Sequence, residues 1–438
     1  MRFHVLGIGP IGSLIAFHLR RTLPQSTPVT LVVKSKSRAR MIRAADGIAI
    51  ETGGTSVVQK GFEVEIFEPL EEIVQDLVQG NTILPFTSSK PKRVGELAPT
   101  KENMDNLNRP IDSLIVCTKA QTTTGIFKRL KRRFTPQSTI VLLQNGMGVY
   151  EQLVTDVFRN PLERPQFVIA TTTHAARAKS HGDIFHTIHI GHGELVFGVV
   201  PDPLNKRDFE RSKDDPSVLI HERTLSLDDI APSSQNPTSH RYGTLRATVA
   251  ALSGMVQLNP VWETFSDLQI RLRKKLVINA IVNPITALIG TSNGSLYGNE
   301  FVRHIIKALC DEACAIFAKE YAGTLNWVPN LSPTPEKDED DSNSRYSDSN
   351  DTPISEYSIP RGLHSEELQR EVSRVIQRTS LNYSSMLVDT WKGRETEVEY
   401  LNGHLRRMGR QYGIPTPTND LLYNLIKFKE VAVPAVRF

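Results

Sequence analysis

The sequence is poor in cysteine. Three cysteines occur among 438 residues, at Cys117, Cys310 and Cys314. Such an odd and sparse set forms no disulfide framework, so we expect the chain to fold in a reducing compartment. Cys310 and Cys314 stand one helical turn apart, but no second pair of cysteines or histidines accompanies them. We therefore interpret both as packing residues rather than as zinc ligands.

Long apolar runs and strong charge bias are also missing. No run of eighteen apolar residues occurs, so we predict no transmembrane helix and no membrane partner. The formal net charge is only +4, and no basic block is interleaved with aromatic residues, so we expect no nucleic-acid partner. A strand and turn begin at the first residues and leave no room for a cleaved targeting peptide. We expect a cytoplasmic protein, with mitochondrial import through a non-cleaved signal left open.

Four of the twelve histidines lie in one predicted β region, at His181, His186, His189 and His192. In a regular strand, His186 and His189 point to opposite faces, which argues against a shared metal site. We interpret these histidines as structural or surface residues, and the sequence predicts no metal site.

A glycine-rich turn follows the first predicted strand, residues 2–6. It has the spacing of a dinucleotide-binding loop and consists of Gly7, Ile8, Gly9, Pro10, Ile11 and Gly12. The three glycines would permit, in order, a tight turn, the approach of a pyrophosphate and close packing of helix on strand. Pro10 suits a first helical turn, whose N-terminus favours phosphate. We predict cofactor binding here. The alternative is a Rossmann-like shell without a cofactor.

The end of the second predicted strand, residues 29–33, lacks an acidic residue. NAD-dependent enzymes place Asp or Glu there for the ribose 2′-hydroxyl. This chain instead reads "KSKSRAR", and cations suit a 2′-phosphate. We therefore predict NADPH/NADP⁺ as the cofactor, with Lys34 as the first choice for the phosphate contact. The alternative is a merely solvated basic face.

The spacing of apolar residues divides the chain into two parts. Apolar strands alternate with helical patterns up to residue 240, including 113–118, 139–146 and strands within 167–198, which indicates a doubly wound sheet. From 241 the period is helical, over 241–254, 263–290, 299–321, 364–392, 395–412 and 418–430. We predict an α/β Rossmann N-terminal domain, 1–240, with insertions near 81–110 and 201–240. An all-α C-terminal domain, 241–438, would follow, with a disordered insert near 332–360.

Polar residues follow two of the predicted strands. Lys119 and Gln121 come after 113–118, and Asn145 lies in "QNGMG" after the strand that begins at 139. Ligands of open α/β sheets bind beyond the carboxyl ends of the strands, so these side chains are candidates for a site. The alternative is ordinary loop chemistry, because Asn-Gly favours turns.

The predicted helix 263–290 carries a polar stripe. Lys275, Asn279 and Asn283 are spaced by four residues and therefore share one helical face, whereas Lys274 would face solvent. One interpretation is an active-site face. The other is that both asparagines form hydrogen bonds within the core while Lys275 extends outward to solvent.

The ordered motifs resemble the 2-dehydropantoate 2-reductase (ketopantoate reductase) family. They are "GIGPIGSLIA", "CTKAQ", "QNGMG", "KLVINAIVNPITAL", "SNGSL", "SSML", "TEVEYLNG" and "YGIPTPTN". They cover both predicted domains in the right order, broken by three insertions. The resemblance implies a Rossmann domain joined to an all-α domain, with the active site in the interdomain cleft. It also implies NADPH-dependent reduction of 2-dehydropantoate to (R)-pantoate, a step in pantothenate and coenzyme A biosynthesis.

The resemblance also implies roles for individual residues. By position, Lys275 matches the family's catalytic lysine, and Lys119 matches its cofactor-site lysine. Lys34 stands where the family usually has arginine. The residues that match its substrate-binding set are Asn145, Asn279, Asn283, Ser385 and Glu397. Asn145 would also face the cofactor.

Other functions stay open at this point. The chain could reduce another 2-oxoacid or ketone, because the shared chemistry does not fix the pocket. It could also be a non-catalytic relative that binds RNA or protein, although a binding module has no need for the polar set. We expect a small-molecule 2-oxoacid as the partner, and the sequence leaves a homodimer open.

Overall fold

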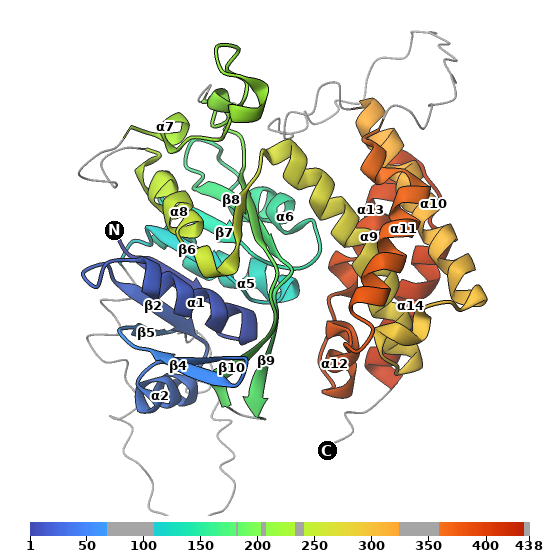
Figure 1. The fold of residues 1–438 in the computed structure, drawn as a ribbon, viewed down its shortest axis with the longest axis horizontal. Coiled ribbons are helices and arrows are strands. Elements are labelled where there is room, and N and C mark those ends of the chain that lie inside the picture. Colours follow the sequence, from blue (N-terminus) through green and yellow to red (C-terminus); the bar gives the residue numbers. More distant parts are fainter. Residues whose placement is uncertain (68–108, 181–182, 203–206, 233–240, 324–358, 433–438) are drawn as a thin grey trace, which may run out of the picture. The chain divides into compact units, whose positions relative to one another are not determined.

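The computed structural model describes residues 1–67, 109–180, 183–202, 207–232, 241–323 and 359–432 (Figure 1). The chain forms two compact units. The first, here the sheet unit, comprises Met1–Gln144 and Gln152–Phe265. The second, here the helical unit, comprises Asn145–Glu151 and Ser266–Phe438. Most of the insertions predicted near 81–110 and 332–360 lie outside the described residues.

The main sheet of the sheet unit has eight strands, in the order β12-β11-β8-β7-β6-β1-β2-β5. The six strands from β5 to β8 run parallel, β11 is antiparallel to β8, and β12 is parallel to β11. The strands are β1 (Phe3–Leu6), β2 (Val29–Val33), β5 (Glu63–Ile66), β6 (Ser113–Val116), β7 (Thr139–Leu142), β8 (Gln166–Thr172), β11 (Leu195–Val199) and β12 (Pro260–Trp262). Every residue of β1, β2, β6 and β7 is buried, as expected of parallel strands covered on both faces.

Helices follow the strands of the sheet unit, which confirms the predicted Rossmann arrangement. They are α1 (Pro10–Thr22), α2 (Lys36–Ala45), α5 (Ala120–Leu130), α6 (Val149–Asp156), α7 (Leu227–Ile230) and α8 (Gly243–Ser253). Short 3₁₀ turns in this unit are η2 (Lys131–Arg133), η4 (Arg211–Lys213), η5 (Ile220–Glu222) and η6 (Val256–Leu258). Part of the predicted insertion 201–240 is therefore ordered as short helical turns.

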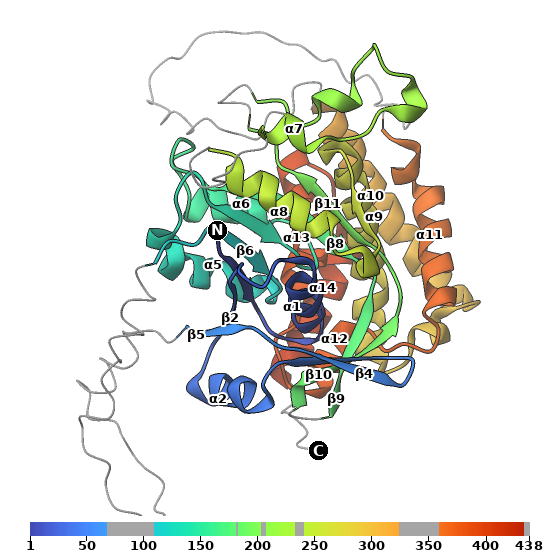
Figure 2. The same cartoon turned by 60° about the vertical axis from the view of Figure 1, so that its left-hand side comes forward.

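A second, four-stranded sheet packs on α1 (Figure 2). Its order is β4 (Thr55–Gln59), β3 (Ile48–Thr52), β10 (Asp183–Gly191) and β9 (Ala175–Ser180). The sequence indicated strands across 167–198 but not that β9 and β10 leave the main sheet. Because α1 is covered by strands on more than one side, its residues from Gly12 to Arg20 are all buried. The Arg20 guanidinium accordingly donates to the carbonyls of Leu23 and Thr27 just after the helix.

The histidines of this second sheet divide between two environments. His189 is buried against the ring of His174, with 3.0 Å between His174 Nδ1 and His189 Nε2. His186 instead lies 3.2 Å from the Ser56 hydroxyl and 3.3 Å from Glu51. The two positions therefore serve separate contacts, and His181 lies outside the described residues.

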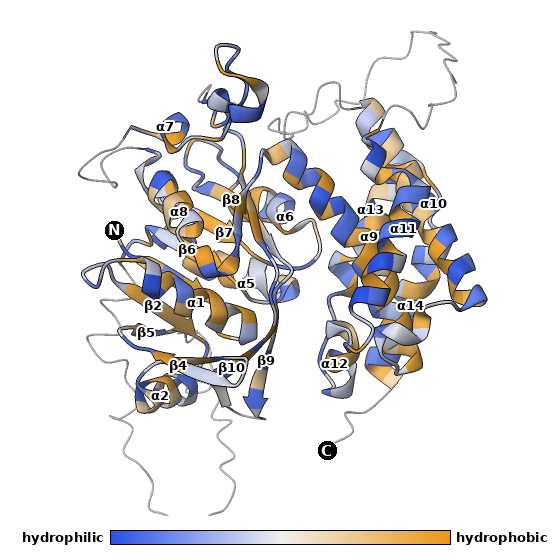
Figure 3. Cartoon of the chain, viewed as in Figure 1, coloured by the Kyte–Doolittle hydropathy of each residue, from blue (hydrophilic) through white to orange (hydrophobic). Residues whose placement is uncertain are grey.

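The helical unit is built from α9 (Phe265–Ile289), α10 (Glu300–Gly323), α11 (Ser365–Arg378), α12 (Ser385–Trp391), α13 (Asn402–Tyr412) and α14 (Pro417–Ala432). The 3₁₀ turns are η7 (Asn293–Leu296), η9 (Arg361–Leu363) and η10 (Val398–Tyr400). Along these helices hydrophobic and hydrophilic residues alternate (Figure 3), and the buried apolar side chains form one core. None of the described helices has both the length and the apolarity that crossing a bilayer requires.

Some helix boundaries differ from the sequence predictions. The helix predicted at 364–392 is two helices, because the Ser384 hydroxyl accepts from the Leu387 N–H and starts α12 anew. The helix expected to open at Thr396-Glu397 begins as the 3₁₀ turn η10, and α13 starts only at Asn402.

The division between the units falls at Phe265, whereas the sequence predicts a boundary between 240 and 241. The reason is α8, whose Leu245, Val249 and Leu252 pack in the core of the sheet unit. Thr248 also donates a 2.9 Å hydrogen bond to Ser113 of β6. The spacing of apolar residues predicts a helix, but it does not indicate in which of the two hydrophobic cores the apolar face of that helix packs.

Candidate active site

The polar stripe on α9 begins beside a buried ion pair. Arg273 donates to both carboxylate oxygens of Glu320 on α10, at 2.9 and 2.7 Å, and both side chains are buried. Paired charges with this geometry tolerate burial because each donor has an acceptor. The pair fixes the α9 turn that carries Lys275. Lys274, which the sequence analysis expected in solvent, is half-buried. Its ammonium lies so close to Gly362 that a Cβ at that position would overlap it.

Lys275 is a half-buried cation with an unusual acidity. Burial lowers its pKa from the ordinary value to about 8, and the negative charge of Glu397 opposes that shift. The two effects act in opposite directions, because desolvation disfavours the ammonium while a nearby carboxylate favours it. Lys275 is therefore a cation that can release its proton near neutral pH.

The glutamate beside Lys275 is buried and has a second polar neighbour. Asn145 Nδ2 lies 3.4 Å from Glu397 Oε2, although 252 residues separate them in the chain. Thr396, next to Glu397, is held by Glu430 of α14, which accepts the Thr396 N–H at 2.8 Å. The structure thus brings Lys275, Asn145 and Glu397 together within the helical unit.

The loop that carries Asn145 docks on the turn that carries Glu397. The Met147 N–H donates a 3.0 Å hydrogen bond to the Tyr400 carbonyl. Gly146 adopts a φ of 80°, and a Cβ there would overlap Tyr400, so only glycine fits this contact. Tyr400 was missed by the sequence reasoning, because the Asn-Gly turn gives no sign of its packing partner.

The two asparagines of the stripe have free side-chain amides. Asn283 is buried and Asn279 is half-buried. Neither amide has a hydrogen-bond partner among the described residues, so the alternative of hydrogen bonding within the core is not seen there. Their side-chain atoms are not among the fully buried unpaired ones of the described residues, so both amides can be reached by a ligand and can donate and accept hydrogen bonds. Asn279 and Asn283 are therefore suited to bind polar atoms of a substrate.

Ser385 lies beyond the end of the stripe. It is the exposed first residue of α12, and its neighbour Ser384 is buried. The Thr286 hydroxyl on α9 donates a 2.8 Å hydrogen bond to Ser384 Oγ, which ties the start of α12 to the turn after Asn283. Thr286 and Ser384 were also missed, because hydroxyls in apolar segments usually only cap or pack.

The glycine loop of the sheet unit has the geometry its spacing predicts. Gly7 has a φ of 92°, and a Cβ there would overlap the backbone of Cys117 and Thr118. A Cβ at Gly12 would overlap the Gly7 carbonyl, whereas one at Gly9 would meet nothing within 4 Å. Two glycines thus serve the turn and the helix packing, and Gly9 leaves open space before the N-terminus of α1. This loop fits a dinucleotide phosphate.

The other predicted cofactor residues also lie at carboxyl ends of strands in the sheet unit. Lys34 is exposed directly after β2, followed by Ser35 at the N-cap of α2, and α2 has no acidic residue in its first turn. Lys119 is half-buried at the N-cap of α5, directly after Thr118, whose backbone packs against Gly7. Gln144, at the end of the next strand, donates to the Thr118 carbonyl at 2.8 Å.

Comparison with known proteins places both units in one family. Residues 3–202 match the family model "Ketopantoate reductase PanE/ApbA", and residues 267–430 match the model of its C-terminal domain. The chain belongs to the ketopantoate reductase family. It is therefore an oxidoreductase of that family, as the ordered sequence motifs predicted.

Two related proteins are named for 2-dehydropantoate reduction. A "2-dehydropantoate 2-reductase" of Vibrio cholerae is 26% identical over 340 residues, which is 77% of this chain and 85% of the relative. A Schizosaccharomyces pombe protein named "Probable 2-dehydropantoate 2-reductase" is 22% identical over 434 residues, covering 97% and 95%.

Solved structures share the fold. A D-mandelate dehydrogenase in complex with NADH and anilino(oxo)acetate superposes with a TM-score of 0.61 at 14% identity, covering 99% of both chains. The 2-dehydropantoate 2-reductase of Geobacter metallireducens gives 0.58 at 15% identity, covering 98% of this chain and 99% of its own. At such identities the likeness concerns the fold alone.

The Lys275–Glu397 pair makes a testable prediction about acidity. Because the carboxylate raises the pKa of Lys275, Glu397→Gln should lower it further, on the order of one pH unit. Amine-labelling rates of the Lys275 peptide, followed by mass spectrometry against pH, measure this value, since only the neutral amine reacts. Glu399→Gln is the control, because Glu399 bonds to Arg407 and Tyr423 instead. An unchanged labelling midpoint in Glu397→Gln would contradict the pairing.

Proposed function

We propose that the protein reduces 2-dehydropantoate to (R)-pantoate with NADPH, a step towards pantothenate and coenzyme A. The observation that carries the proposal is the environment of Lys275. Its pKa is lowered to about 8, Glu397 is its neighbour, and two asparagine amides follow on the same helical face. Relatives named for this reaction support the choice of substrate.

Lys275 would act as the general acid. Reduction of a ketone adds hydride to the carbonyl carbon and a proton to the oxygen. A bound nicotinamide cofactor supplies the hydride. The Lys275 ammonium would give its proton to the oxygen as negative charge develops there, and the neutral amine would regain a proton from water. A pKa near 8 keeps the amine mostly protonated at pH 7 and makes it a stronger acid than an ordinary lysine.

The surrounding residues match the polar groups of the proposed substrate, which has a carboxylate, a ketone and a hydroxyl. Buried Glu397 would accept a hydrogen bond from the hydroxyl, because a carboxylate is an acceptor only. Ser385 would bind the substrate carboxylate. The amides of Asn279 and Asn283 would orient Lys275 and the substrate. Holding these groups in reacting geometry lowers the barrier by removing the entropy of their encounter.

The cofactor residues would act from the sheet unit. The Gly7–Gly12 loop would bind the pyrophosphate, and Lys34 would contact the 2′-phosphate of NADPH. The basic first turn of α2 supports NADPH over NADH, because an acidic residue in this place would repel the phosphate. Lys119 and Asn145 would align nicotinamide and substrate.

Direct assay separates this function from its competitors. The purified protein should oxidise NADPH with 2-dehydropantoate faster than with a panel of other 2-oxoacids, including an aromatic one. The gene should also rescue a pantothenate auxotroph. Faster turnover of another 2-oxoacid would transfer the activity to that substrate. Absence of any turnover, together with capture of RNA or a protein, would favour a binding role.

Replacing the general acid should lower turnover strongly without affecting cofactor binding. Lys275→Ala should lower kcat for 2-dehydropantoate at least roughly 10²-fold. NADPH fluorescence titration should give a dissociation constant close to that of the wild type. The neighbouring Lys274→Ala is the matched control and should keep its turnover. Wild-type turnover in Lys275→Ala would remove this lysine from the mechanism.

Replacing the cation after β2 should change cofactor preference. Lys34→Ala should lower kcat/KM for NADPH roughly 10-fold to 100-fold, because it removes a charge-assisted contact to the 2′-phosphate. The same variant should leave kcat/KM for NADH unchanged, since NADH lacks that phosphate. Lys60→Ala, an exposed lysine that pairs with Asp46, is the control. An unchanged NADPH-to-NADH ratio in Lys34→Ala would exclude Lys34 from this role.

A further inference from the structure

A proline interrupts the hydrogen bonding of the helix that carries the polar stripe. Pro284 lies within α9, and it has no N–H to donate to the carbonyl four residues earlier, which belongs to Ala280. Both residues are buried, so water does not replace the missing donor. A buried carbonyl without a donor is destabilising, and a proline in mid-helix usually ends or kinks the helix. Yet α9 continues to Ile289.

A side chain from another helix supplies the missing donor. Asn402, the first residue of α13, is fully buried, and its Nδ2 donates a 2.8 Å hydrogen bond to the Ala280 carbonyl. Its second N–H donates to Asn419 Oδ1 of α14 at 3.0 Å. With both of its amide hydrogens bonded, the Asn402 side chain has one orientation in which all of these contacts are made.

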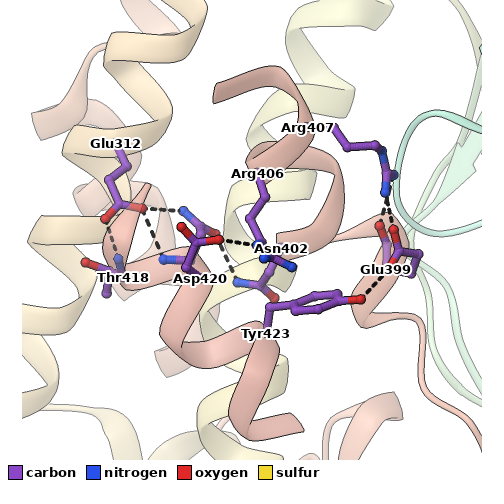
Figure 4. A network of polar contacts seen from close by, with 9 residues as sticks. Glu312, Glu399, Asn402, Arg406, Arg407, Thr418, Asp420 and Tyr423 are labelled. Carbon is purple, nitrogen blue, oxygen red and sulfur yellow. Dashed lines mark hydrogen bonds and ion pairs between the residues drawn. The ribbon is translucent and has the colours of Figure 1, made fainter. Parts of the chain in front are cut away.

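The network extends to a fourth helix, α10 (Figure 4). Glu312 of α10 accepts from Asn419 Nδ2 at 2.7 Å, and it accepts the backbone N–H of Thr418 at 2.7 Å. Glu312 thereby satisfies donors in the first turn of α14, where a negative charge is favourable. The chain of bonds from Glu312 through Asn419 and Asn402 thus ends on the backbone of α9.

The bonded carbonyl lies inside the polar stripe. Ala280 follows Asn279 and precedes Asn283 by three residues, so a bond to its carbonyl fixes the turn that carries both amides. Asn402 also stands five residues after Glu397, which is the N-cap of η10, and it begins α13 two residues after η10 ends. One buried amide therefore connects the turn of Glu397 with the turn of the two asparagines.

We propose that Asn402 is a positioning residue of the reductase site, which replaces the donor that Pro284 withholds and so sets the geometry of Asn279 and Asn283. It does not touch the substrate itself. This inference rests on the proposed function for its kinetic consequence but not for its structural one.

A double-mutant cycle between Asn402 and Pro284 tests this role. Asn402→Ala removes the donor and should lower kcat/KM for 2-dehydropantoate at least roughly tenfold, because displaced asparagines bind the substrate less well. NADPH affinity should not change. Pro284→Ala restores a main-chain N–H to the Ala280 carbonyl, so in that background Asn402→Ala should have a much smaller effect. Equal losses in both backgrounds, or no loss in Asn402→Ala, would overturn the proposal.

Hydrogen exchange separates this inference from the proposed function. Asn402→Ala should speed amide exchange in the α9 peptide around Ala280, and Pro284→Ala should reverse that increase, whatever the substrate of the enzyme. The control Ser365→Ala removes a different, partly buried hydrogen bond of the helical unit, to Asp311, and should leave exchange in α9 and kcat/KM unchanged. If the exchange cycle holds while 2-dehydropantoate is not turned over, only the substrate assignment fails. If exchange in α9 does not respond to Asn402→Ala, the positioning role fails.

Discussion

Two opposing effects act on the charge of Lys275, and burial is the larger of the two. Burial on α9 disfavours the ammonium, and the carboxylate of Glu397 restores part of its stability, so the pKa falls only to about 8. This value depends on geometry that several helices supply together. Arg273 pairs with Glu320 to fix the preceding turn, and Glu430 holds the backbone beside Glu397.

The sheet unit solves a different problem, the close approach of a charged ligand to the backbone. Its central parallel strands are buried on both faces, and ligands of such sheets bind beyond the carboxyl ends of the strands. Gly7 and Gly12 take up backbone contacts that a side chain would block, and Gly9 leaves its surroundings open. The proposed preference for a phosphorylated ribose rests on the cation after β2 and on the lack of an acidic residue in the first turn of α2.

The sequence predicts the structural features that depend on residues close together in the chain. The spacing of apolar residues and glycines predicts the strands β1, β2, β6 and β7, the glycine loop and the polar stripe of α9. Features that depend on contacts between residues far apart in the chain could not be predicted from the sequence. The spacing of apolar residues in α8 does not indicate that this helix packs on the sheet. The sequences of β9 and β10 likewise do not indicate that these strands belong to a second sheet.

The same limit applies to the site. The roles of Asn145 and Glu397 came from the family resemblance, because nothing local says that residues 252 positions apart lie 3.4 Å from each other. Asn402 was missed altogether. A signal for it did exist, since Pro284 leaves a buried helix short of one donor and some polar side chain must replace it. Finding which one requires the packing of α13 on α9.

The pH dependence of kcat/KM for 2-dehydropantoate, with NADPH saturating, tests the central claim most directly. An acid with a lowered pKa must be protonated to act, so kcat/KM should be level in the neutral range and should fall above about pH 8. The fall should approach tenfold per pH unit, as expected for loss of one proton. A rate that stays level to pH 10, where Lys275 is deprotonated, would contradict its role as the proton donor.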